Sequence, residues 1–135
     1  MTESEALSPV RKLNAEDITD FFDCGQEELN RFLKRLALPN QAANAAQTYV
    51  TCRENRVVGY YSLAVGSVQP EQSTKRTPKG LARHAAPVMI LARLAVDRSE
   101  QHAGIGRALL EDALFRTAQA ANIAGIRALV VHAKN

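Results

Sequence analysis

An apolar run followed by a glycine turn is the feature that most constrains this chain. Residues Val88 to Val96 are almost continuously apolar, which is typical of a strand covered on both faces of a sheet. The stretch Gln101-His102-Ala103-Gly104-Ile105-Gly106 follows and opens a helical pattern from Arg107 to Asn122. A strand, a tight turn and a helix start bring free backbone N–H groups and a positive dipole end together. The sequence therefore predicts either an anion site that takes a pyrophosphate or a plain strand–helix connection with two glycines for turn geometry.

Composition limits the classes of protein to which the chain can belong. With 135 residues, of which 46% are hydrophobic, the chain can form one domain with a real core, and we expect a single domain over residues 1–135 with 1–9 disordered. No apolar run approaches the ~20 residues of a membrane span, and the N-terminus has no signal-peptide pattern. Cys24 and Cys52 are the two cysteines, so we expect no disulfide framework, no metal centre and a cytoplasmic protein. The net charge of +3 is compatible with a nucleic-acid partner.

Two segments have the periodicity of amphipathic helices. The first follows Asp23, which with Gln26 resembles a capping box, and its apolar positions are Leu29, Phe32, Leu33 and Leu36. We expect Pro39 to stop this helix. The second runs from Gly104 to Asn122 and ends at Gly125, with an apolar half that we expect to pack on the sheet: Leu109, Leu110, Ala113, Leu114, Thr117, Ala120 and Ala121. Phe115 falls among the polar residues, where a partner or a further segment could cover it.

Four further segments complete a mixed pattern of strands and loops. Val10 to Leu13 is expected as a short first strand, and Thr48 to Arg53 with Val57 to Val65 as a hairpin turned at Glu54-Asn55. Ala128 to His132 is expected as another buried strand. The long loop from Gln69 to Pro87 carries several basic residues, which either bind nucleic acid or are simply solvated. Arg93, inside the apolar run, needs a partner or must point into a cleft.

Two motifs in these segments resemble a known enzyme family. Leu94-Ala95-Val96-Asp97 followed by Gln101 to Gly106 resembles motif A of the GNAT N-acetyltransferases, a strand followed by [Q/R]-x-x-G-x-[G/A] at a helix start. Upstream, Phe22-Asp23-Cys24-Gly25 and Leu29-Asn30-Arg31-Phe32-Leu33 resemble the N-terminal signature of GNAT toxins from bacterial toxin–antitoxin pairs. The resemblance covers about Leu13 to Asn135. It implies the GNAT fold, an α/β (α+β) chain with a mixed, mostly antiparallel twisted sheet flanked by helices.

The resemblance also implies an activity, a cofactor and partners. Such toxins are acetyltransferases that use acetyl-CoA to acetylate the amino group of aminoacyl-tRNA, which blocks translation. Their antitoxins are small ribbon-helix-helix proteins, the pair represses its own operon, and operator DNA is contacted only through the antitoxin. We also expect a homodimer. Two other interpretations stay open: a GNAT acetyltransferase of a small amine or protein N-terminus, and a catalytically dead truncated form that still binds CoA and antitoxin.

The implied binding residues lie on both sides of the glycine turn. The backbone of Leu94 to Val96 would pair with the pantetheine arm, and that of Gln101 to Gly106 would hold the pyrophosphate. The cofactor-binding candidates are Leu94, Ala95, Val96, Gln101, His102, Ala103, Gly104, Ile105, Gly106 and Asn135. The candidates for contact with tRNA are Lys75, Arg76, Lys79, Arg83 and Arg93. A structural ion pair is the alternative for Arg93.

No catalytic residue is expected within the chain. The usual general acid of the family is a tyrosine on a helix after the last strand, so we expect it to lie beyond Asn135, with the usual C-terminal helix and strands lacking. Tyr49, Tyr60 and Tyr61 lie in the hairpin and match no such position. A peptide α-amino group has a pKa of about 7.7–8.0, and a neighbouring ester lowers it. A strong general base is therefore dispensable, and a water chain could suffice.

Overall fold

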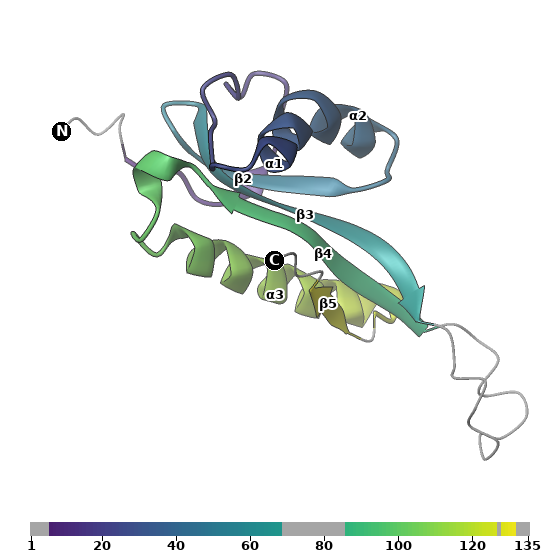
Figure 1. Ribbon diagram of the computed structural model, residues 1–135. Coiled ribbons are helices and arrows are strands. Elements are labelled where there is room, and N and C mark those ends of the chain that lie inside the picture. Colours follow the sequence, from purple (N-terminus) through teal and green to yellow (C-terminus); the bar gives the residue numbers. More distant parts are fainter. Residues whose placement is uncertain (1–5, 69–85, 127, 132–135) are drawn as a thin grey trace, which may run out of the picture.

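Five strands within the described residues form one sheet (Figure 1). The computed structural model describes residues 6–68, 86–126 and 128–131. The strands lie side by side in chain order: β1 (Arg11–Lys12), β2 (Gln47–Arg53), β3 (Arg56–Val68), β4 (Ala86–Val96) and β5 (Leu129–Val131). Each pair from β1 to β4 is antiparallel, and β5 is parallel to β4. This mixed, mostly antiparallel sheet confirms the predicted fold class.

Helices cover both faces of the sheet (Figure 1). One face carries α1 (Glu27–Arg31), the π-helical turn η2 (Phe32–Leu36) and α2 (Ala37–Ala42), and the other carries α3 (Ile105–Ala124). Tyr60 is buried with Phe22, Phe32 and Leu33 under the first layer. The next residue, Tyr61, is buried with Leu109 under α3. Successive side chains of a strand point to opposite faces, so the Tyr60-Tyr61 pair contributes one ring to each core.

The first helix does not begin with the predicted capping box. Its N-cap is Gln26, which makes no side-chain cap hydrogen bond. The Asp23 carboxylate instead accepts hydrogen bonds from the Gly25 N–H and the Asn30 side-chain amide, at 2.9 and 3.0 Å. The capping-box prediction is therefore wrong, because the Asp23 side chain closes a turn before the helix begins.

The prediction that Pro39 ends this helix is also wrong. In η2 the N–H of Ala37 donates to the carbonyl of Phe32, five residues back. This wide turn separates α1 from α2, so that Pro39 lies in the first turn of a new helical segment. A proline at that point is tolerated, because first-turn N–H groups have no acceptor within their own helix.

Helix α3 buries a stripe rotated from the predicted one. Ile105, Leu109, Ala113 and Thr117 are buried against the sheet, whereas Leu110 and Leu114, predicted on the same half, are 37% and 51% exposed. Phe115 is also exposed, as its position among polar residues predicts.

The rotation of α3 brings two polar residues onto the sheet. Asp112 accepts a hydrogen bond from the Tyr61 hydroxyl at 2.6 Å and an Arg116 hydrogen bond at 2.7 Å. The Arg116 guanidinium lies over the ring of Tyr49, which stacks on Tyr61. A buried phenol needs a hydrogen-bond partner, and these polar side chains of α3 supply it.

The predicted hairpin is confirmed, and two strand predictions need correction. Glu54 and Asn55 both have positive φ, 51° and 68°, as a tight hairpin turn requires. β4 already begins at Ala86, so the end of the predicted loop belongs to the strand, and residues 69–85 lie outside the described part of the chain. β5 is not buried as predicted, since Val131 is 55% exposed. Its described ladder pairs only with β4.

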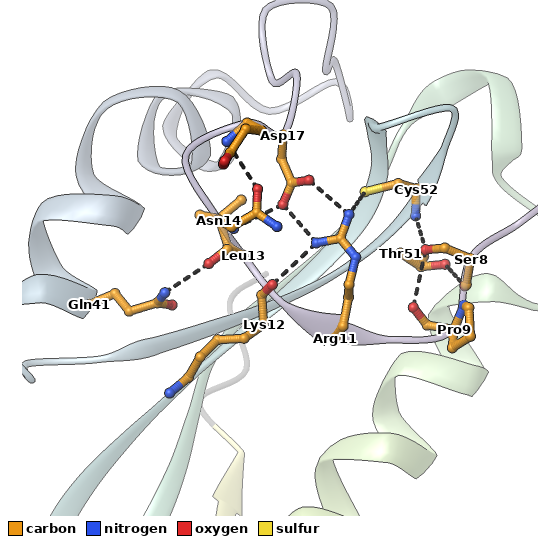
Figure 2. A network of polar contacts seen from close by, with 11 residues as sticks. Ser8, Pro9, Arg11, Lys12, Leu13, Asn14, Asp17, Gln41, Thr51 and Cys52 are labelled. Carbon is orange, nitrogen blue, oxygen red and sulfur yellow. Dashed lines mark hydrogen bonds and ion pairs between the residues drawn. The ribbon is translucent and has the colours of Figure 1, made fainter.

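A polar network holds the N-terminal segment on β2 (Figure 2). The Arg11 guanidinium lies between Asp17, with two hydrogen bonds of 2.9 and 2.8 Å, and the Cys52 sulfur at 3.6 Å. The Ser8 N–H donates to the Cys52 carbonyl at 2.8 Å, and the Ser8 hydroxyl accepts from the Cys52 N–H at 2.9 Å. The predicted disorder of residues 1–9 therefore does not hold at Ser8. In the same network the Gln41 side chain bridges two backbone segments.

Candidate functional site

An irregular turn joins the end of β4 to the start of α3. Asp97 follows β4 and caps the short 3₁₀ helix η3 (Arg98–Glu100), with its carboxylate accepting from the Ser99 N–H at 3.0 Å and hydroxyl at 2.6 Å. Burial of the Asp97 carboxyl raises its pKa, but the hydrogen bonds from Ser99 and from the Asp23 N–H outweigh burial and lower it. The turn therefore rests on a buried, ionised carboxylate.

The glycines of the turn leave space at the N-terminus of α3. Gly104 is the N-cap, has a left-handed φ of 85°, and would carry a Cβ with nothing within 4 Å. Among the described residues no side-chain cap hydrogen bond closes the start of α3, so its first-turn N–H groups face that space. A Cβ on Gly106 would lie 3.7 Å from Val96 Cγ2 and 3.9 Å from Leu94 Cδ2, which are ordinary contact distances. Turn geometry accounts for Gly104 but not for Gly106.

β4 has a bulge next to this turn. The β3–β4 register shifts between Ser62, which pairs with Arg93, and Leu63, which pairs with Leu91, so Ala92 is the extra residue. The described β4–β5 pairs end at Leu91↔Val131. Beyond the bulge, Leu94 to Val96 pair with β3 on one side, and the described part of β5 offers no partner on the other. An extended ligand can add to such an edge by main-chain hydrogen bonds.

A cleft of about 660 Å³ lies beside the bulge, between the first helical layer and β4. It combines apolar side chains with two guanidinium groups and a carboxylate. Its lining residues are Gln26, Glu28, Leu29, Arg31, Phe32, Leu36, Leu91, Ala92, Arg93, Leu94 and Val131. The volume is in the range of small-molecule sites.

Arg93 is the charged residue of β4, and its guanidinium lies in this cleft. It sits 3.9 Å from the centroid of the Phe32 ring, a distance at which a cation is attracted by the ring face. The sequence predicts that Arg93 has a partner or points into a cleft, and the structure shows both. The described partner is an aromatic ring and not the carboxylate of an ion pair.

The two buried tyrosines have committed hydroxyl groups. Tyr60 donates to the Leu29 carbonyl at 2.7 Å, and Tyr61 donates to Asp112. Burial raises the pKa of both phenols well above their ordinary value. Both hydroxyl groups are therefore engaged within the protein core.

The structure brings most of the predicted binding residues together. Leu94 to Val96 and Gln101 to Gly106 form a continuous path from the β4 edge to the α3 N-terminus. Asn135 and the basic loop residues Lys75, Arg76, Lys79 and Arg83 lie outside the described residues. The sequence motifs did not assign Gln26, Glu28 or Arg31 to the site, although Arg31 lies within one of them. The available signal was their place directly after the Asp23-Cys24-Gly25 signature.

The fold and this site define an acetyltransferase of the GNAT class. Residues 10–135 match the model of the Acetyltransferase (GNAT) family, and the chain belongs to that family, whose acyl donor is acetyl-CoA. A "tRNA-acetylating toxin" of Mycobacterium tuberculosis is 43% identical over 126 residues, which are 93% of this chain and 75% of that protein.

Solved structures of GNAT toxins have the same fold. AtaTR bound with acetyl-CoA matches with a TM-score of 0.83 and 31% identity, over 96% of this chain and 78% of that one. AtaT complexed with acetyl-methionyl-tRNAfMet matches with a TM-score of 0.81 and 31% identity, over 96% and 79%. Across the described residues, no helix is long and apolar enough to cross a membrane.

Proposed function

We propose that this chain is the toxin of a bacterial toxin–antitoxin pair and acetylates the α-amino group of aminoacyl-tRNA, which blocks translation. The observation that carries the proposal is the 43% identity, over 93% of the chain, to a tRNA-acetylating toxin. The cleft agrees with it, because its lining joins basic groups suited to phosphates with apolar side chains suited to an aminoacyl group.

The glycine turn and the β4 edge fit acetyl-CoA as the donor. The open space at Gly104 and the uncapped N-terminus of α3 suit a pyrophosphate. The backbone edge from Leu94 to Val96 suits the amides of the pantetheine arm. We therefore assign Leu94 to Val96 and Gln101 to Gly106 to the donor, and Asn135 stays a prediction. When bound, acetyl-CoA supplies the acetyl group as a thioester.

The cleft residues would hold the acceptor. Arg31 and Arg93 place positive charge where the 3′ end of a tRNA would enter, and the Arg93 guanidinium lies over the Phe32 ring. The α-amino group of an aminoacyl ester is partly neutral at pH 7, so the cleft need not supply a strong base. The basic loop residues Lys75, Arg76, Lys79 and Arg83 extend this proposal to the acceptor stem and predict a strong salt dependence.

The proposal includes the partners of such toxins. The similarity to AtaTR supports a cognate antitoxin for this chain. From the family resemblance we expect a ribbon-helix-helix antitoxin, operator DNA bound only through it, a toxin homodimer and a cytoplasmic location.

Transfer of labelled acetyl groups tests the acceptor. The chain is incubated with acetyl-labelled acetyl-CoA and tRNA charged with each amino acid in turn, beside uncharged tRNA, a polyamine and a peptide with a free N-terminus. We expect label only on charged tRNA. Label on the polyamine or the peptide alone would overturn the tRNA proposal in favour of another acetyltransferase activity. CoA binding without any transfer would favour the catalytically dead form.

Arg93 can be tested against a surface lysine of the same charge. We expect Arg93→Gln to raise the KM for charged tRNA about tenfold or more, the loss of one charge-assisted contact, without changing CoA affinity in calorimetry. Lys12→Gln, on β1, is the control and should leave both unchanged. Equal KM values in the Arg93 variant and the wild type would remove Arg93 from the acceptor site.

A further inference from the structure

The segment Asp23-Cys24-Gly25 is fastened to the glycine turn. Asp97 Oδ1 accepts a hydrogen bond from the Asp23 N–H at 2.8 Å, and the Arg98 N–H donates to the Asp23 carbonyl at 2.8 Å. The Gln101 side-chain amide donates to the Cys24 carbonyl at 3.2 Å and to the Val96 carbonyl at 3.0 Å. One amide group thus joins the end of β4, the turn and a segment far away in the sequence.

The same segment also holds α1, the helix that lines the proposed acceptor cleft. Asn30 is only 5% exposed, and its side chain donates to Asp23 Oδ1 at 3.0 Å and accepts from the Cys24 N–H at 2.9 Å. These bonds tie the turn of Asp23 to α1 in both directions. Arg31, the last residue of α1, and Phe32, the first residue of η2, follow directly and line the cleft.

The packing at Gly25 shows that this contact is close. Gly25 has a φ of 94°, and a Cβ there would lie 3.2 Å from Nε of Arg98. The Arg98 guanidinium ends an exposed side chain and can move aside, but L side chains rarely adopt this positive φ, so a substitution would strain the segment. The contact between the segment and the turn therefore depends on glycine geometry as well as on hydrogen bonds.

We infer that Gln101 and Asp97 are positioning residues that couple the donor turn to the acceptor cleft. The inference rests on the proposed function, because it takes the turn as the donor site and the cleft as the acceptor site. The Gln101 side-chain amide bridges the carbonyls of Cys24 and Val96, so its role differs from that of the backbone N–H groups around it. When the donor binds, it orders the turn. The hydrogen bonds of Asp23 and Asn30 then extend this ordering to α1.

Hydrogen exchange with CoA alone tests this coupling without any turnover. In the wild type, saturating CoA should slow amide exchange in residues 26–36 at least threefold, although these residues belong to the acceptor side. In Gln101→Leu, at CoA concentrations that calorimetry shows to be saturating, this slowing should be lost. Gly25→Ala disturbs the same contact from the side of the Asp23-Cys24-Gly25 segment, and this variant should also lose the slowed exchange. It serves as the second variant if Gln101→Leu does not fold.

Gln41 provides the matched control. Its side-chain amide also bridges two backbone segments, because it donates to the Leu13 carbonyl at 2.8 Å (Figure 2) and accepts from the Thr48 N–H at 3.1 Å. Gln41→Leu should lower the stability of the fold but keep the CoA-dependent slowing in residues 26–36.

The outcomes separate the coupling from the proposed function. Wild-type protein that binds CoA without slowed exchange in residues 26–36, or Gln101→Leu that keeps the slowing, would overturn the coupling alone. Protein that shows the coupling but transfers no acetyl group to charged tRNA would overturn the proposed function alone. Wild-type protein that does not bind CoA would overturn both.

Discussion

Replacing Gly106 with alanine separates the two interpretations of the glycine turn. The new methyl group would lie 3.7 Å from Val96 Cγ2 and 3.9 Å from Leu94 Cδ2, so no neighbour has to move. Gly106 lies in the first turn of α3, and alanine is about 0.5–1 kcal/mol more favourable than glycine within a helix. We expect the free energy of unfolding to rise by up to about 1 kcal/mol.

The same methyl group should weaken CoA binding. It stands beside the first-turn N–H groups of α3 and the edge of β4, where the proposed donor approaches the backbone. Loss of one hydrogen bond to a charged group costs about 1.5–3 kcal/mol, which corresponds to a tenfold to hundredfold lower affinity. Gly106→Ala is therefore expected to be more stable than the wild type and to bind CoA more weakly.

Urea denaturation and calorimetry with CoA, on one preparation, measure the two effects. A variant with raised stability and unchanged CoA affinity would refute the donor-site argument and favour a plain strand–helix connection. A variant with clearly lowered stability would show instead that the packing around Gly106 is tighter than the distances indicate.

Three further predictions test the packing and the electrostatics of the fold. Gly59→Ala would place a Cβ 3.0 Å from Ile105 Cγ2 in the buried contact with α3, so we expect urea denaturation to show a loss of about 1–3 kcal/mol, and wild-type stability would contradict this packing. Asp17→Asn breaks the paired hydrogen bonds with Arg11, which should cost about 1.5–3 kcal/mol and leave CoA affinity in calorimetry unchanged; an unaltered urea midpoint would show that the network in Figure 2 is not stabilising. Burial raises the pKa of the Cys52 thiol from 9.0 to about 11, so its contribution to stability is complete below pH 9.0 and is lost as pH rises toward 11, because the unfolded chain ionises first. The free energy of unfolding, measured by urea denaturation at each pH, should fall less steeply over this range for Cys52→Ala than for the wild type. An equal slope in both proteins would assign the fall to other groups.

Local patterns were sufficient to predict most of the elements. The hairpin at Glu54-Asn55 follows from β-branched and aromatic runs on either side of two turn-forming residues. The apolar run of β4 and the glycines at both ends of α3 likewise carry their own signals. Each of these predictions depends on residues near one another in the chain.

The errors occurred where a distant segment decides the outcome. Pro39 follows a π-helical turn whose side chains are held by the sheet, and no local rule indicates that turn. The face of α3 is set by the Tyr61 hydroxyl, which needs Asp112, and by Tyr49, which takes Arg116. A pattern that counts only apolar residues places Leu110 inside and Asp112 outside, whereas in the structure Leu110 is exposed and Asp112 is half-buried against Tyr61.

The local sequence predicts the proposed donor half of the candidate site but not the proposed acceptor half. Residues Gln101 to Gly106 are contiguous, so the strand–turn–helix order alone brings the free N–H groups of α3 to one place. The cleft instead combines α1, η2 and the β4 bulge at Ala92, segments that meet only when the sheet forms. The bonds from Gln101 and Asp97 to Asp23-Cys24-Gly25 are of the same kind. A motif can specify backbone geometry within one turn, but only tertiary packing decides which distant side chains complete the site.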